Sequence, residues 1–294
     1  MAITPDFLAV GHVTKDVLPA GGYTVGGTVT YAALTAQALG LSAAVLTSAP
    51  PDMELSRLLP GIAVRIVPSD VATTFENIYE GTRRHQYVHG VAKPLRALDL
   101  PVAWKRTPIV LLGPLVGELG LDWLGRSAPA GVRPERGALS AAVVGVTPQG
   151  WMRQWDGDGR VSTKPWAEAG QILPEVDVLV FSEDDVAGDE AVVRQYAALA
   201  RLAVVTRGRH GATVFRDGTA RDFPAFRARE VDPTGAGDVF ATAFLVRLHE
   251  TGDPYQAARF ANCTASFAIE GPGTTAIPTR SQVEQRLRRG GFYE

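Results

Sequence analysis

The sequence predicts an α/β fold with a mostly parallel central sheet flanked by helices and a small β lid. Short β-branched segments alternate with longer amphipathic ones, which is the pattern of strands that feed helices over a parallel sheet. The candidate strands are almost continuously apolar, as expected where helices cover both faces of a sheet. They span residues 7–11, 43–47, 109–112, 139–144, 176–181 and 203–206. Apolar residues make up 46% of the 294 residues, which is enough for a large core.

The helices are indicated by residues that are typical of helix starts and helix ends. The segment 32–39 predicts a helix that ends at Gly40, a residue typical of C-cap positions. The apolar run 236–249 predicts a second helix, and a proline in a first-turn position opens a third over 254–270. A capping box predicts the start of the last helix, over 279–289.

Two segments depart from this pattern. Residues 13–25 are polar and contain glycine, whereas residues 73–89 alternate in the manner of exposed antiparallel strands around a turn at 81–83. We expect parts of 13–25 and 73–89 to form a small lid over a cleft. A second hairpin is predicted over 212–223 by an Asp-Gly turn. Because no linker or internal repeat is evident, we expect residues 1–294 to form one domain with this lid.

The composition excludes several classes of function. A net charge of −2 gives no electrostatic reason to expect nucleic acid or an acidic membrane as a partner. Cys263 is the only cysteine, so no intrachain disulfide and no cysteine cluster for zinc can form. The N-terminus lacks the order of a signal peptide, and the apolar runs are too short to span a bilayer. We therefore expect a cytoplasmic protein.

The strongest functional signal is Asp232-Pro-Thr-Gly-Ala-Gly-Asp238, directly before the apolar run 239–245. Gly235 and Gly237 carry no Cβ, so the backbone can approach a ligand closely. They lie where a helix is expected to begin, and its N–H groups and positive dipole end favour an anion there. Asp238 could accept a proton from a hydroxyl that attacks a phosphoryl group. An ordinary glycine-rich turn is the alternative, and spacing alone does not decide between the two.

This heptapeptide resembles the C-terminal signature of the PfkB, or ribokinase-like, carbohydrate kinases. Four further segments are similar to that family and occur in its order: 11–16, 26–40, 204–212 and 257–268. The resemblance therefore covers nearly the whole chain. It implies a ribokinase-like fold and an enzyme that moves the γ-phosphoryl of ATP to a hydroxyl of a sugar or polyol.

The resemblance also implies roles for individual residues. Those implied in catalysis are Asp238, as the base, and Gly235, Ala236 and Gly237, as the anion hole. Those implied in acceptor binding are Asp16, Gly27, Tyr31 and Gln149. Those implied near the nucleotide are Thr206, Gly208, Gly211 and Asn262. Mg²⁺ would bridge the ATP phosphates largely through water, with Asp185 on the metal side. The use of a monovalent cation is left open, as is the choice between monomer and homodimer.

Three departures from the family pattern bear on the acceptor. Tyr31 stands where many members have Asn, Ser182-Glu-Asp-Asp185 replaces Asn-x-x-Glu, and Thr147-Pro-Gln149-Gly150 replaces Asp-x-Asn. Three features are similar to inositol-kinase-like members: Tyr31 after the double glycine, Leu112-Gly-Pro-Leu115, and Gln149-Gly150 followed by Arg153. Myo-inositol is therefore the favoured acceptor.

Several alternatives stay open. A nucleoside kinase of the same fold would need a larger aromatic pocket, for which Tyr31 leaves room. Tyr31 could instead be a core aromatic at the start of its helix. The altered Ser182 and Asp185 also permit a non-catalytic ligand-binding protein on a kinase scaffold. Arg153 is either an acceptor contact or part of an apolar stripe with exposed polar partners.

Overall fold

The central element of the fold is a nine-stranded sheet in the order β15-β14-β13-β12-β9-β8-β1-β4-β5. The structure is a computed structural model that describes residues 4–80, 83–124, 139 and 143–292. Seven strands are parallel: β1 (Phe7–Val10), β4 (Ala43–Ala49), β5 (Ala63–Pro68), β8 (Ile109–Leu112), β9 (Val143–Val146), β12 (Val178–Ser182) and β13 (Leu202–Thr206). The antiparallel hairpin β14 (Ala212–Arg216) and β15 (Thr219–Phe223) extends one edge.

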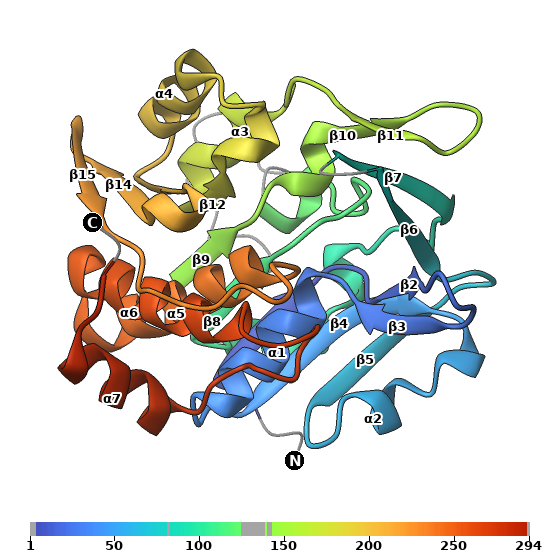
Figure 1. Ribbon diagram of the computed structural model, residues 1–294. Coiled ribbons are helices and arrows are strands. Elements are labelled where there is room, and N and C mark those ends of the chain that lie inside the picture. Colours follow the sequence, from blue (N-terminus) through green and yellow to red (C-terminus); the bar gives the residue numbers. More distant parts are fainter. Residues whose placement is uncertain (1–3, 81–82, 125–138, 140–142, 293–294) are drawn as a thin grey trace.

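Helices cover both faces of this sheet (Figure 1). One face packs against α1 (Thr28–Ala38), α2 (Leu55–Leu58), α5 (Ala236–Thr251), α6 (Pro254–Ala268) and α7 (Arg280–Arg289). The other packs against α3 (Ala169–Ile172) and α4 (Glu190–Leu199). Successive side chains of β1 enter opposite cores, with Phe7 in the first and Leu8 in the second. This two-sided burial explains why the central strands are apolar throughout.

A second, four-stranded sheet has the order β3-β2-β6-β7. It consists of β2 (Thr14–Val17), β3 (Tyr23–Gly26), β6 (Thr73–Glu80) and β7 (Arg83–Gly90). The short hairpin of β10 (Arg153–Trp155) and β11 (Val161–Thr163) lies next to it, through a bridge between Tyr87 and Arg160. Because β2 follows β1 after only three residues, the small sheet stands at the carboxyl end of the central strands (Figure 1).

The predicted architecture is confirmed in outline. The mostly parallel sheet, its covering helices and the hairpin at 212–223 are present, and Thr279 and Gln282 form the expected capping box. That the small sheet acts as a lid, and that the chain is one domain, stay predictions. The strand expected over 139–144 is described only from Val143, because 140–142 lie outside the described residues.

The first helix begins at Thr28, four residues before the expected start at 32. Its β-branched first turn disfavours helix intrinsically, yet Thr28, Val29 and Thr30 are all buried. Tertiary packing therefore overrides local propensity here. Among the described residues, no helix is long and apolar enough to cross a membrane.

Candidate active site

The predicted site residues lie at the carboxyl edge of the central sheet, where parallel sheets of α/β proteins commonly bind ligands. Asp16 lies on β2, which continues from β1, and Gln149 follows β9 in the 3₁₀ helix Gln149–Met152. Asp185 follows β12, Thr206 ends β13, and Asp238 lies in the first turn of α5. Segments far apart in the sequence therefore converge on one edge.

The glycine turn before α5 has the conformation that an anion site requires. Gly235 is the N-cap of α5, with φ 77° in the left-handed region that glycine favours. The space beside Gly237 is open, so a ligand can reach the first-turn N–H groups. Asp232 braces the turn, because its carboxylate accepts from Thr234 N and from Gly273 N, both at 2.9 Å. We call residues 232–238 the anion loop.

The pKa of the Asp238 carboxyl is raised above its ordinary value. Burial raises the pKa of its carboxyl to about 6, and the negative charge of Asp185 acts in the same direction. The hydrogen bond from the Thr28 hydroxyl and the positive charge of Arg153 lower the pKa and so limit the rise. Asp238 is therefore mostly ionised at neutral pH while its pKa stays close to that pH, which suits a general base.

Asp16 is held against the double glycine on the acceptor side. Thr14 Oγ1 donates to Asp16 Oδ1 at 2.9 Å, and the Asp16 carboxylate lies against the Cα of Gly26, where no side chain would fit. Gly27 has φ 89° and lies close to the carbonyl of His12, so it too is required to be glycine. Burial raises the pKa of Asp16, and the Thr14 bond and Arg153 oppose that shift.

Arg153 lies near the predicted site, and its contact with an acceptor stays a prediction. Its positive charge lowers the pKa of both Asp16 and Asp238, so the guanidinium lies within electrostatic reach of both carboxylates. It also lies 5.7 Å from the ring centroid of Phe75 on β6. Arg153 thus lies near Asp238, Asp16 and the small sheet.

Tyr31 lies behind the anion loop. It is only 5% exposed and packs in a cluster with Val239 and Ala268. Its ring lies against Gly235, on the side where any other residue would carry a Cβ. Burial, followed by the charges of Asp232, Asp238 and Asp16, raises the pKa of the Tyr31 hydroxyl, so it stays protonated. The burial of Tyr31 is that of a core aromatic residue. Contact between Tyr31 and the acceptor stays a prediction.

The metal-side residues form a capping box. Asp185 Oδ2 accepts from Ser182 N at 2.9 Å, and Asp185 Oδ1 accepts from Gln149 Nε2 at 3.2 Å. The carboxylate remains half-buried and close enough to Asp238 to raise its pKa. A carboxylate has acceptor capacity beyond two bonds, so Asp185 fits a water-mediated contact to phosphate-bound Mg²⁺. No group of three or more metal-binding side chains occurs among the described residues.

The residues predicted near the nucleotide fall into two pairs. Thr206 and Gly208 lie at the end of β13, where Thr206 pairs in register with Ser182 of β12. Gly211 and Asn262 have scaffold contacts instead: a side chain on Gly211 would collide with the carbonyl of Phe223, and Asn262 Nδ2 donates to that carbonyl at 3.1 Å. Asn262 is 6% exposed. Nucleotide contact by these four residues stays a prediction.

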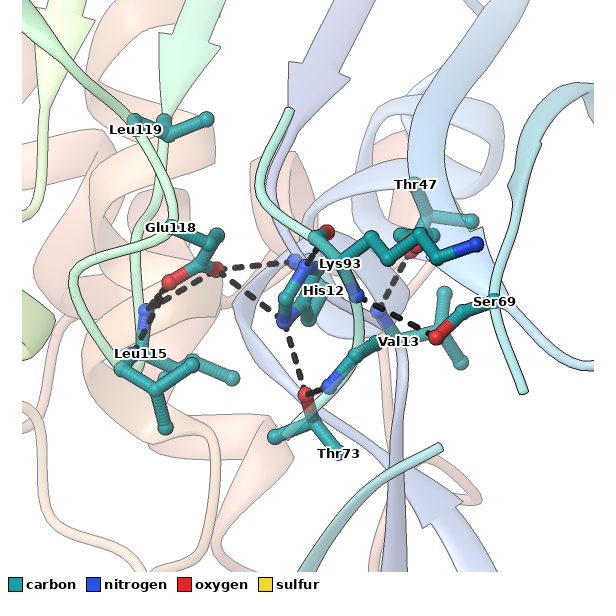
Figure 2. A network of polar contacts seen from close by, with 12 residues as sticks. His12, Val13, Thr47, Ser69, Thr73, Lys93, Leu115, Glu118 and Leu119 are labelled. Carbon is teal, nitrogen blue, oxygen red and sulfur yellow. Dashed lines mark hydrogen bonds and ion pairs between the residues drawn. The ribbon is translucent and has the colours of Figure 1, made fainter. Parts of the chain in front are cut away.

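A buried polar network, not predicted from the sequence, lies beneath the acceptor side (Figure 2). His12 Nε2 lies 2.9 Å from the carbonyl of Lys93 and therefore carries a hydrogen. His12 Nδ1 then accepts from the Thr73 hydroxyl at 2.7 Å, and the Thr73 oxygen in turn accepts from Ala92 N at 3.0 Å. The network fixes the start of β6 to the segment that follows β7.

Glu118 is the second part of this network. Its carboxylate accepts from the backbone N–H groups of His12 at 3.0 Å, Leu115 at 2.9 Å and Val116 at 2.9 Å. The residue is only 3% exposed, so these bonds replace hydration of the charge. Leu115 lies against Gly27, so Glu118 supports the floor of the acceptor side. A lone glutamate 106 residues from His12 gives no sequence signal of this role.

Comparisons with known proteins agree with this fold. A family model for the pfkB family carbohydrate kinases matches residues 162–280. The 2-dehydro-3-deoxygalactonokinase of Haloferax volcanii is 36% identical over 129 residues, which span 40% of each protein. The cytidine kinase of Thermococcus kodakarensis is 26% identical over 255 residues, which span 82% of this chain and 87% of that kinase.

The fold is also that of solved kinases. One is a pyrophosphate-dependent kinase in the ribokinase family complexed with a pyrophosphate analog and myo-inositol, with TM-score 0.78 and 23% identity over 95% of this chain and 99% of the other. Residues 162–280 thus match the pfkB family of carbohydrate kinases, and the fold of the chain is that of a kinase in the ribokinase family. The anion loop and Asp238 lie within the segment that the family model matches.

Proposed function

We propose that the protein transfers the γ-phosphoryl group of ATP to a hydroxyl of a small sugar or polyol, in the cytoplasm, with myo-inositol as the favoured acceptor. One observation carries the proposal: a carboxylate with a pKa raised to about 6 directly follows a glycine turn that opens toward ligand at a helix N-terminus. Phosphoryl transfer needs this pairing of a base with an anion hole.

Asp16, beside Arg153, binds acceptor hydroxyls and directs one of them toward Asp238. Asp238 accepts the proton of that hydroxyl as its oxygen attacks the phosphorus. The N–H groups of the anion loop stabilise the charge on the transferring group. Mg²⁺, when bound with the nucleotide and approached by Asp185 through water, neutralises phosphate charge. Closure of the small sheet as a lid excludes water and suppresses hydrolysis of the donor.

A neutral, hydroxyl-rich acceptor suits the acceptor side, because Asp16 accepts hydrogen bonds whereas Arg153 donates them. The myo-inositol complex of the structurally similar pyrophosphate-dependent kinase supports a polyol. A nucleoside is the second candidate, and the long alignment with the cytidine kinase favours it. The non-catalytic alternative loses support, because Asp185 retains a carboxylate within electrostatic reach of Asp238.

The test is a matrix of donors and acceptors with the purified full chain. Either ATP or pyrophosphate is supplied with Mg²⁺, and phosphorylated product is measured with myo-inositol, ribose, fructose, fructose phosphate, adenosine or cytidine. We expect the highest kcat/KM with ATP and myo-inositol. Asp238→Asn should lower kcat by about 10³-fold or more while donor affinity stays nearly unchanged, because the loss lies in the transition state.

Each result in the matrix has a separate meaning. Preference for a nucleoside would replace the polyol, and preference for pyrophosphate would replace ATP as the donor. Near wild-type turnover by Asp238→Asn would reject the catalytic mechanism. Absence of product in every combination would reject the phosphotransferase assignment itself.

A further inference from the structure

We propose that Tyr31 is a positioning residue that sets the geometry of the anion loop through Gly235, instead of a residue that contacts the acceptor. The proposal rests on the phosphotransferase function proposed above. It concerns the contact between α1, in the N-terminal part of the chain, and the loop that precedes α5.

The contact is direct and close. A Cβ on Gly235 would collide with Cε1, Cδ1 and Cζ of Tyr31, so the flat ring covers the glycine at van der Waals distance. Gly235 has φ 77°, and the ring occupies the side on which any other residue would carry its side chain. The ring therefore acts as a rigid surface against which the backbone of the loop rests.

The ring itself has little freedom to move. Tyr31 is 5% exposed and packs with Val239 at the start of α5, Ala268 at the end of α6 and the partly buried Ile277. Its backbone N–H donates to Gly27 O at 3.4 Å within the first turn of α1. Side chains that are closely packed on all sides keep one rotamer, so the surface offered to Gly235 is fixed.

The same face of α1 also holds the base. Thr28 donates to the Asp238 carboxylate, and Tyr31 lies three positions further along the helix, on the same side. One helix thus positions both the carboxylate that accepts the proton and the turn that stabilises the phosphoryl charge. Their relative position is set by α1, because both contacts arise from its first two turns.

The hydroxyl of Tyr31 lies toward the far side of the loop. A Cβ on Gly273 would stand 4.0 Å from the Tyr31 hydroxyl oxygen, and Gly273 N donates to Asp232 at 2.9 Å. The hydroxyl is therefore directed to the junction between Asp232 and the 271–273 segment. The Tyr31 ring supports the turn at Gly235, and the junction supports it at Asp232.

This arrangement predicts which kinetic constant depends on Tyr31. An anion hole acts on charge that develops in the transition state, so displacement of its N–H groups lowers kcat. An acceptor contact would instead alter the KM of the acceptor. Loss of the ring face should therefore lower kcat and leave acceptor KM nearly unchanged.

The experiment compares Tyr31→Phe, Tyr31→Leu and Tyr31→Met with the wild type. Phe retains the ring, so we expect kcat within about twofold of the wild type. Leu and Met fill part of the volume without a flat face, so kcat should fall by about 10- to 100-fold with acceptor KM changed by no more than about twofold. Either variant suffices if the other fails to fold.

Tyr196→Leu is the matched control. Tyr196 is equally buried at 5%, but it belongs to the core on the opposite face of the sheet. Its replacement should lower the melting temperature without lowering kcat. A fall in kcat that merely followed loss of stability would appear in this control as well, and would overturn the positioning role.

The remaining outcomes separate the two proposals. If Tyr31→Phe raises acceptor KM, or Tyr31→Leu keeps wild-type kcat, the positioning role is wrong while the kinase function stands. If the wild type transfers no phosphoryl group, the function is wrong, and binding of inorganic phosphate then decides the positioning role. We expect Tyr31→Leu to bind phosphate about tenfold more weakly and Tyr31→Phe to match the wild type, because a displaced loop presents its N–H groups poorly. Equal binding by all three proteins would overturn it.

Discussion

The donor side and the acceptor side of this site are built in different ways. The anion loop consists of seven consecutive residues, 232–238, and offers a ligand the backbone N–H groups that any helix start provides. The acceptor side depends on side chains from separate segments, such as Asp16 on β2 and Arg153 on β10. Phosphate can be bound by a short motif, whereas a particular polyol requires side chains that long-range contacts must hold in place.

The supports of the two sides differ in the same way. Glu118 accepts from His12, 106 residues away, and Thr73 contacts His12 across 61 residues. By contrast, Asp232 fixes its own loop through Thr234, two residues on, although Gly273 also takes part. The family model matches 162–280 and so contains the anion loop but not Asp16 or Glu118. The match with the family model therefore includes the local motif and excludes these two residues of the predicted acceptor side.

Paired glycine substitutions test this division most severely. Gly235 and Gly27 both have positive φ and no room for a Cβ, but the first meets Tyr31 and the second meets the carbonyl of His12. We expect Gly235→Ala to lower kcat by about 10²-fold or more, because it displaces the anion hole. Gly27→Ala should chiefly raise acceptor KM, by about tenfold, because it displaces the floor beneath the acceptor. Steady-state kinetics with both substrates varied will measure the two effects.

If Gly235→Ala and Gly27→Ala changed kcat and acceptor KM in the same way, the donor side and the acceptor side would not act separately. A useful control is Gly252→Ala, at the C-cap of α5, where φ is 67° but no atom lies within 4 Å of the added Cβ. It carries similar backbone strain at a position away from the site, so it should lower stability without altering either constant.

A smaller effect is expected from Glu118→Gln. The amide has one oxygen in place of two, so at least one of the N–H groups of His12, Leu115 and Val116 loses its acceptor. Because Leu115 packs against Gly27, we expect acceptor KM to rise by about tenfold while donor KM stays unchanged.

Glu250→Gln provides the control for this substitution. Glu250 binds Arg280 at 2.6 Å and Arg247 at 3.1 Å on a helix remote from Asp16, so its loss should affect stability alone. Equal donor and acceptor effects in Glu118→Gln would contradict a role confined to the acceptor side.

The sequence predicts the fold and the helix start at the anion loop, but not the buried residues that support the acceptor side, for a physical reason. Gly235, Gly237 and Asp238 form a recognisable local motif, because a helix start, backbone freedom and a carboxylate occur within four residues, although spacing alone does not exclude an ordinary turn. His12 and Glu118 are ordinary polar residues whose partners become neighbours only in the folded chain. Thr28 likewise gives no signal in the sequence, yet its hydroxyl hydrogen-bonds to the Asp238 carboxylate.

Arg153 links the two sides, so its removal should produce the smallest and most informative change. Asp238 must be ionised to accept a proton, so kcat should rise with pH through about 6, the pKa of that carboxyl. Arg153 lowers this pKa by favouring the charged form. In Arg153→Met the acid limb of the kcat profile should therefore move to higher pH. Arg207→Met, which removes a cation paired with Glu183 and Glu190 on the donor side, should leave the limb in place. A shift to lower pH in Arg153→Met, or an equal shift in both variants, would show that the charge of Arg153 does not act on the base, and that the two sides are coupled by some other contact.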